Sequence, residues 1–180
     1  MSNREKFRME RPLSGMNAKI EMQIPSLRRY AWSLTGNRHD ADDLVQDCIE
    51  KAIRGWGSLK NEDKLRQWLF SILHNQFLND IRRRRNRQEE KHDPLDVDIP
   101  NLQTQADTVY LRQVLRAVMK LTPERRSVLT LVAVEGLSYD AVAAVLDIPI
   151  GTVMSRLSRA RADHRDVLDG DAASNLKIVK

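Results

Sequence analysis

Apolar residues recur at helical spacing in several separate stretches, and short polar, glycine- or proline-containing runs interrupt them. Spacings of three and four residues place such side chains on one face of a helix, so the sequence predicts an all-α fold. The predicted helices span Ile24–Thr35, Ala41–Trp56, Leu65–Arg87, Val109–Leu121 and Pro123–Glu135, followed by two short helices within Leu137–Arg165.

The two short helices form the most informative stretch. Ser138 is placed to cap the first, and Pro149 ends it, since proline disfavours helix in the residue before it. The second begins near Gly151 and turns Val153, Leu157, Ala160 and His164 inward. Its outward residues are small or basic: Thr152, Ser155, Ser158, Arg159 and, at the margin, Arg156. This pattern predicts a helix-turn-helix that presents its second helix to DNA; the alternative is a helical hairpin with a solvated basic face.

The helix predicted at Ala41–Trp56 carries an acidic face. Its apolar residues include Ala41, Leu44, Val45 and Cys48, and the opposite side holds Asp40, Asp42, Asp43, Asp47 and Glu50. Acidic residues in a first turn complement the helix dipole, but five along one helix exceed that need. A solvated surface and a docking surface for a basic partner are both compatible with this helix alone.

The helix predicted at Leu65–Arg87 pairs an apolar side with a face rich in amides, hydroxyls and, at its end, arginine. That polar face holds Gln67, Ser71, His74, Asn75, Arg82 and Arg85. From Arg82 to Lys91 six positive residues stand against two negative ones. A basic run is usually a solvated surface, but the neighbouring side chains are of the kinds that reach base edges, which favours contact with nucleic acid.

Composition divides the chain into two small helical domains joined by a flexible linker. Residues 92–107 contain two prolines, four aspartates and no lysine or arginine. The predicted boundaries are a disordered extension at 1–19, a first domain at 20–91, the linker at 92–107, a second domain at 108–168 and a tail at 169–180. The 180 residues carry a net charge of +5, which allows a nucleic-acid partner.

No catalytic, metal or cofactor chemistry is predicted. The four histidines have no ligand spacing with one another or with Cys48, and no glycine-rich phosphate loop is present. The single cysteine, the charged N-terminus and the lack of a long apolar run predict a cytoplasmic protein without membrane insertion.

Two motifs add a family resemblance. The first is Asp40-Ala41-Asp42-Asp43-Leu44-Val45-Gln46-Asp47, and the second is Gly151–Arg161, with Leu121–Arg126 and Gly136–Tyr139 between them. They resemble the region 2 motif D-A-E-D-L-V-Q-E and the region 4 motif G-T-V-x-S-R-L-x-R-A-R of extracytoplasmic-function (group IV) sigma factors of bacterial RNA polymerase. Two departures are Met154, where the family often has a basic residue, and Asp147, where glycine is common but aspartate tolerates left-handed geometry.

The resemblance implies three surfaces. It assigns docking on the clamp helices of the largest polymerase subunit to Asp40, Asp42, Asp43, Leu44, Gln46, Asp47 and Glu50. Contact with the −10 promoter element falls to Gln67, Ser71, His74, Asn75, Asn79, Arg82, Arg83 and Arg85. Contact with the −35 element falls to Thr152, Met154, Ser155, Arg156, Ser158 and Arg159.

The resemblance further implies a stress-responsive alternative sigma factor that is a monomer when free. Its partners are the polymerase core, including the β-subunit flap, promoter DNA and an anti-sigma factor. Two other functions are alternatives to a sigma factor. A sigma-mimicking protein that sequesters an anti-sigma factor needs no DNA-reading side chains and usually needs a switch domain. A stand-alone helix-turn-helix repressor needs a dimerisation element and leaves residues 22–90 without a role.

Overall fold

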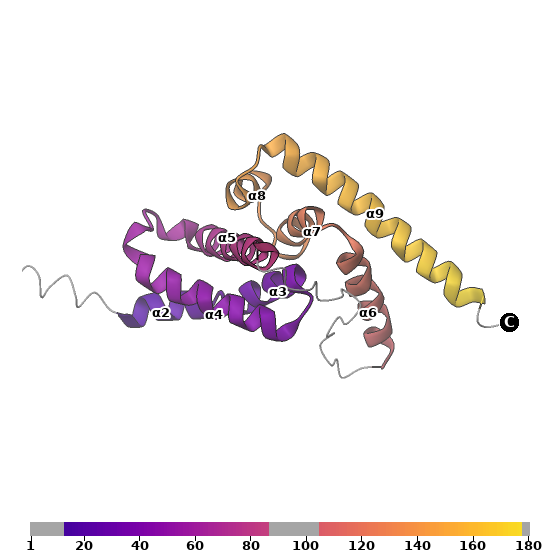
Figure 1. The fold of residues 1–180 in the computed structure, drawn as a ribbon, viewed down its shortest axis with the longest axis horizontal. Helices are drawn as coiled ribbons and strands as arrows, with labels where there is room; N and C mark the ends of the chain where they lie inside the picture. The colour runs from indigo at the N-terminus through magenta and orange to yellow at the C-terminus, as the bar shows by residue number, and fades with distance from the viewer. Residues whose placement is uncertain (1–12, 87–104, 178–180) are drawn as a thin grey trace, which may run out of the picture.

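Helices make up the regular structure of the residues that the computed structural model describes, 13–86 and 105–177 (Figure 1). Side chains are described for residues 15–84 and, Arg112 apart, 111–165. The first half holds α2 (Leu13–Glu21), α3 (Ile24–Thr35), α4 (Arg38–Gly55), the 3-10 turns η1 (Trp56–Ser58) and η2 (Glu62–Lys64), and α5 (Leu65–Asn86). The second holds α6 (Gln105–Lys120), α7 (Pro123–Leu129), the π-helical turn η3 (Thr130–Val134), α8 (Tyr139–Leu146) and α9 (Ile150–Lys177). The predicted all-α fold is confirmed for these residues.

The chain begins its helical structure earlier than expected. The extension predicted at 1–19 to be disordered is wrong from Leu13 onward, because α2 occupies Leu13–Glu21. Met16 and Ile20 are buried in the core, and Lys19 pairs with Glu62. Two apolar anchors four residues apart are too few to stand out as a periodic pattern in a polar segment.

Local backbone chemistry fixes the turn between α3 and α4. Gly36 ends α3 in the left-handed conformation, with φ 70°, and its N–H donates to the Trp32 carbonyl at 2.8 Å. Asn37 then caps α4, since its Oδ1 accepts from the Asp40 N–H at 3.1 Å. A Cβ at position 36 would lie 2.5 Å from the Met119 Cε. Glycine is therefore favoured here by its backbone angle, whereas the end of the flexible Met119 side chain can shift aside.

α8 and the first turns of α9 form the predicted helix-turn-helix. Ser138 caps α8 as expected, accepting from the Ala141 N–H at 3.2 Å. Asp147 closes the helix with φ 53°, the left-handed geometry that aspartate was expected to tolerate. α9 starts at Ile150, one residue earlier than predicted, and stays helical to Lys177, so the predicted tail at 169–180 is wrong as far as Lys177.

The predicted helix at Pro123–Glu135 is divided in two. α7 ends at Leu129, and η3 follows with a widened turn in which the Glu135 N–H donates to the Thr130 carbonyl at 3.0 Å. Glu135 is only 3 % exposed. The linker predicted at 92–107 ends earlier than expected, because α6 begins at Gln105; its other residues lie outside the described part of the chain.

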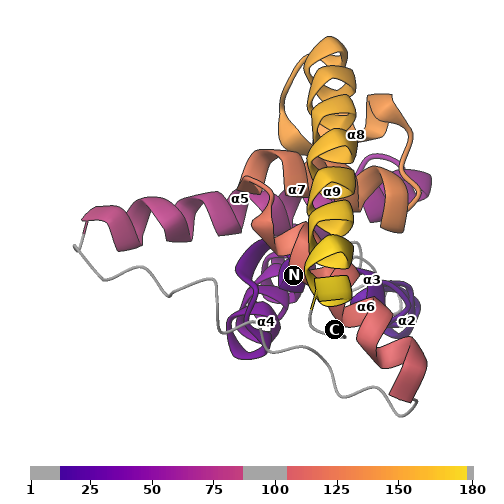
Figure 2. The ribbon, with the colours of Figure 1, turned by 90° about the vertical axis from the view of Figure 1, so that its right-hand side faces the viewer.

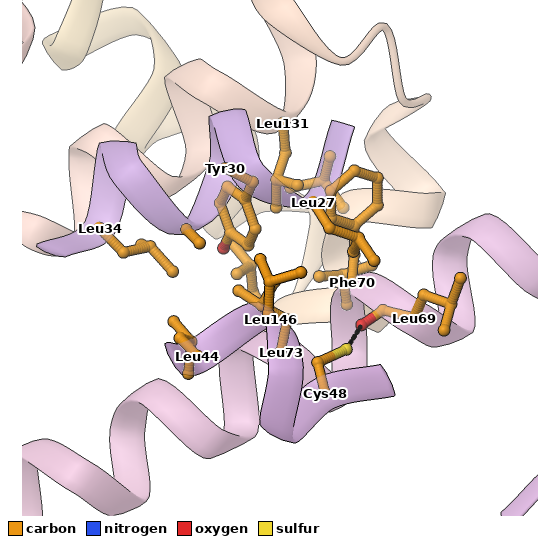
Figure 3. Close-up of a cluster of buried hydrophobic side chains, with 14 of the residues drawn as sticks. Leu27, Tyr30, Leu34, Leu44, Cys48, Leu69, Phe70, Leu73, Leu131 and Leu146 are labelled. Carbon is orange, nitrogen blue, oxygen red and sulfur yellow. Dashed lines mark hydrogen bonds between the residues drawn. The ribbon is translucent and has the colours of Figure 1, made fainter. Parts of the chain in front are cut away.

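The two halves share one apolar core (Figure 3). α5 packs against α8, and α3 packs against α7 and η3. Tyr30 and Phe70 meet edge to face with ring centroids 5.4 Å apart, in a cluster that Leu131 and Leu146 of the second half complete. The domains predicted from composition therefore pack side by side in this structure.

Two helices extend from this core. α9 runs along α7 and α6, and the far end of α5 projects beyond the other helices (Figure 2). Among the described residues, no single helix is long and apolar enough to cross a membrane; α8 and the first part of α9 meet that test only together, as a pair bent by 102°.

Candidate nucleic-acid interface

The acidic surface of α4 is open to solvent along one side. Its exposed members are Asp43, Gln46, Asp47 and Glu50, whereas Asp40 and Asp42 are half-buried. Leu44, predicted as part of this surface, is 4 % exposed and belongs to the core. The structure therefore removes Leu44 from the exposed surface, because its position on the helix matches that of Ala41 and Cys48.

Three arginines of the first half neutralise part of this surface, and one of them, Arg54, pairs with Glu50 at 2.7 Å. Arg84 approaches Asp40 at 3.4 Å, and Arg28 approaches Asp42 at 3.0 Å. Exposed pairs of this kind are worth little in stability and exchange readily with other partners. Among the described residues, Asp47 makes no ion pair, so it presents its full charge to solvent.

The polar face of α5 is accessible at its far end and covered near its start. Asn75, Asn79, Arg82 and Arg83 are exposed, and Gln67 and Ser71 are half-buried. The Arg85 backbone continues this helix, while its side chain lies outside the described residues. These exposed amides and guanidinium groups all lie between the middle and the end of α5.

His74 departs from the predicted DNA-contacting face. Its imidazole is 8 % exposed, and Nδ1 shares a hydrogen bond of 2.9 Å with the Tyr30 hydroxyl. Burial, helped by the positive charge of Arg156, lowers the pKa of His74 from 6.5 to about 4. The side chain is therefore neutral near pH 7 and cannot touch DNA in this arrangement.

The recognition face of α9 is largely as predicted. Met154, Ser155, Ser158 and Arg159 are exposed, and Thr152 and Arg156 are half-buried. Ile150, 43 % exposed, was missed because the helix was expected to begin after it. With Met154, 53 % exposed, it forms an apolar pair one helical turn apart at the end of the helix that enters the major groove in this motif.

A groove of about 1100 Å³, also missed from the sequence, separates α3 and α4 from the helices of the second half. Its apolar lining includes Trp32, Leu111, Val114, Leu115, Val118 and Val134. Its charged lining is mostly basic: Arg28, Arg29, Arg38, Arg161 and Arg165, with Asp42 as the one acidic member. The signal for it was weak, since each half contributes only part of the lining.

These surfaces define a class of protein. Two helical modules each present a polar, basic helix to solvent, the second on a helix-turn-helix, which is the arrangement of a bipartite DNA-binding regulator. Family models agree with this division: one for the Sigma2 domain of PhyR matches residues 20–74, and one for sigma-70 region 4 matches residues 111–163.

Whole-chain comparisons define the family. The ECF RNA polymerase sigma factor EcfG of Rhodopseudomonas palustris is 35 % identical over 152 residues, covering 84 % of each chain. The sigma factor RpoE of Bartonella quintana, solved in complex with the anti-sigma factor NepR, superimposes with a TM-score of 0.76 at 30 % identity, over 87 % of this chain and 98 % of that one. The chain belongs to the extracytoplasmic-function sigma factors.

A sigma-like fold also occurs in a protein of different function. The anti-anti-sigma factor PhyR of Bartonella quintana, in complex with NepR, superimposes with a TM-score of 0.54 at 19 % identity, over 82 % of this chain and 49 % of that one. This similarity concerns the fold alone. The sequence identity is higher to the sigma factors EcfG and RpoE than to this anti-anti-sigma factor.

Proposed function

We propose that this chain is an alternative sigma factor that binds RNA polymerase core and directs initiation at promoters with paired −10 and −35 elements. The observation that carries the proposal is the combination, in one chain, of an exposed acidic helix face with two separate exposed faces that carry amide, hydroxyl and basic side chains. The chain does no covalent chemistry in this role; the polymerase supplies it. We expect it to act in the cytoplasm.

The acidic surface of α4 supports docking on basic positions of the largest polymerase subunit, at its clamp helices. Complementary charge speeds association and excludes wrong partners. Asp43, Asp47 and Glu50 are the exposed carboxylates that supply it. The second half binds the β-subunit flap in this proposal.

The −10 element is read by the exposed part of α5. Opening a duplex costs a few kcal/mol for each base taken out of the stack. Arg82 and Arg83 offset part of that cost by neutralising phosphates, and Asn75 and Asn79 offer amides to an exposed base edge.

The −35 element is read by α9. In this proposal the exposed Arg159 contacts a guanine edge or a phosphate, and the short side chains of Ser155 and Ser158 let the helix enter the groove. Met154 offers no charge, so its contribution is apolar contact with a thymine methyl group.

An anti-sigma factor binds the groove between the halves. A basic rim around an apolar lining fits an amphipathic helix with acidic flanks. A sigma factor of similar structure was solved with such a partner, which supports the assignment. Binding there contacts both modules at once and holds them together.

Transcription of a genomic DNA library by purified core polymerase, with sequencing of transcript 5′ ends, tests the proposal. We expect new transcription start sites that depend on the added chain and share two upstream sequence motifs. A set of starts identical with and without the chain contradicts it. A repressor would only remove starts made by another sigma factor, and a mimic would add none while still binding an anti-sigma factor.

A further inference from the structure

Among the residues whose side chains are described, one buried carboxylate lies in the contact between the two halves. Glu135, directly after η3, has no exposed side-chain surface, and its two oxygens accept hydrogen bonds from the first half. Arg29 of α3 donates from Nε at 2.9 Å and from Nη2 at 3.0 Å, and Arg66 of α5 donates from Nη2 at 2.7 Å. One carboxylate of the second half thus ties two helices of the first.

The partners of Glu135 are held in position by their own neighbours. Arg29 Nη2 also donates to the Ser26 hydroxyl at 2.9 Å, and the Arg66 guanidinium lies 5.5 Å from the Phe70 ring centroid. A buried carboxylate is costly without its cations, whereas both arginines are half-exposed and tolerate separation. Opening the interface therefore requires Glu135 to become hydrated.

The closed arrangement is incompatible with reading a promoter. His74, which the resemblance assigned to the −10 set, is buried beside Arg156 of the −35 set, so α5 and the first turns of α9 are neighbours. The two promoter elements lie about 25 base pairs apart, or about 85 Å along B-form DNA. Reading faces that are neighbours in one compact core cannot reach both elements.

We propose that Glu135, with Arg29 and Arg66, is an intramolecular latch that keeps the free chain closed and must be released before it reads DNA. Closure of the free chain does not depend on the proposed sigma-factor function, whereas the expected effect on transcription rests on it. The closed state needs no partner, so docking on the polymerase has to supply the free energy of opening.

Small-angle X-ray scattering of the free full-length chain measures the latch. We expect Glu135→Gln and Arg66→Gln each to increase the radius of gyration with unchanged helical circular dichroism. Asp140→Asn, which removes an exposed charge from α8, is the matched control and leaves it unchanged. Adding Arg66→Gln to Glu135→Gln produces no further opening, because the interaction is already lost.

The functional readout is the concentration of chain that gives half-maximal promoter-specific transcription with a fixed amount of core. Glu135→Gln lowers it about three- to tenfold, in proportion to the increase in the open fraction. Unchanged scattering, or an opened variant with the wild-type half-maximal concentration, overturns the proposal. Should Glu135→Gln lose helical signal, Arg66→Gln alone decides.

Failure of the latch and failure of the function are separable. Scattering reports closure whether or not the chain initiates transcription. If Glu135→Gln opens the chain but the wild type yields no promoter-specific product, the latch is supported and the sigma-factor role is refuted. If the wild type transcribes normally but the scattering is the same in every variant, the sigma-factor role is supported and the latch is refuted.

Discussion

His74 is neutral because of its surroundings rather than its sequence neighbours. Burial disfavours the charged form, and the positive charge of Arg156 adds to this effect. The Tyr30 hydroxyl shares a hydrogen bond with the ring. Burial also raises the pKa of Tyr30, so the phenol stays protonated beside it. The pair is a polar link inside an apolar interface, and both members are needed to keep it satisfied.

Stability should therefore depend on pH through His74. Its folded pKa of about 4 lies below the 6.5 of an exposed histidine, so the unfolded chain binds the proton first. The stabilisation is fully present above about pH 6.5 and is lost as pH falls toward and below 4, by about 3 kcal/mol. Urea unfolding at several pH values, compared with His74→Gln, measures it. A wild-type-minus-variant difference that stays constant from pH 7 to 4 rules this out.

Single residues also mark where sequence reasoning succeeds. Ser138 and Asp147 were predictable because capping and left-handed termination depend on a few adjacent residues. Helical spacing also placed Leu44 on the apolar side of its helix, where it is found, and only the family resemblance put it in the docking set. The burial of His74 was not predicted, because it depends on contacts with residues far away in the chain. The hydrogen-bonded ion pair between Arg29 and Glu135 joins residues 106 positions apart, so no local sequence pattern predicts it.

At the scale of helices, α4 uses one side for packing in the core and the opposite side for the proposed docking surface. One side of it is built from buried residues, while Asp47 points away from the core and makes no ion pair among the described residues. A change at Asp47 therefore alters the charge of the surface without altering the packing beneath it.

Asp47→Arg should weaken binding to polymerase core by at least about tenfold, because it places a positive charge against a basic partner. Fluorescence anisotropy with purified core gives the affinity. Asp63→Arg makes the same change of charge at an exposed position in η2 and serves as control. Equal core affinities for wild type and Asp47→Arg would exclude this helix as the docking surface.

Helix periodicity predicted the elements well and their junctions less well. α4, α5 and α8 were recoverable because apolar residues repeat over two turns or more. The π-helical turn η3 was not, since an added residue in one turn leaves no mark in composition. Glu135 directly follows this turn and contacts Arg29 and Arg66 of the first half, so the proposed latch depends on an element that the sequence did not predict.

The whole molecule is two modules in contact, each with a surface that the other partly covers. α8 lies on α5, and the groove on the other side of α3 is lined from both modules. In this closed arrangement the exposed reading faces of α5 and α9 are held too close together to reach both promoter elements. Opening changes their spacing, which couples −10 and −35 recognition to docking on the polymerase.

The central claim is that both modules read the same promoter. It is tested most directly by transcription with purified core on four templates that carry a promoter mapped for this chain: intact, −10 scrambled, −35 scrambled and both scrambled. We predict that scrambling either element alone lowers the product at least about tenfold, because each mismatched base pair costs about 1–3 kcal/mol. Full activity from a template that keeps only one of the two elements would contradict the account.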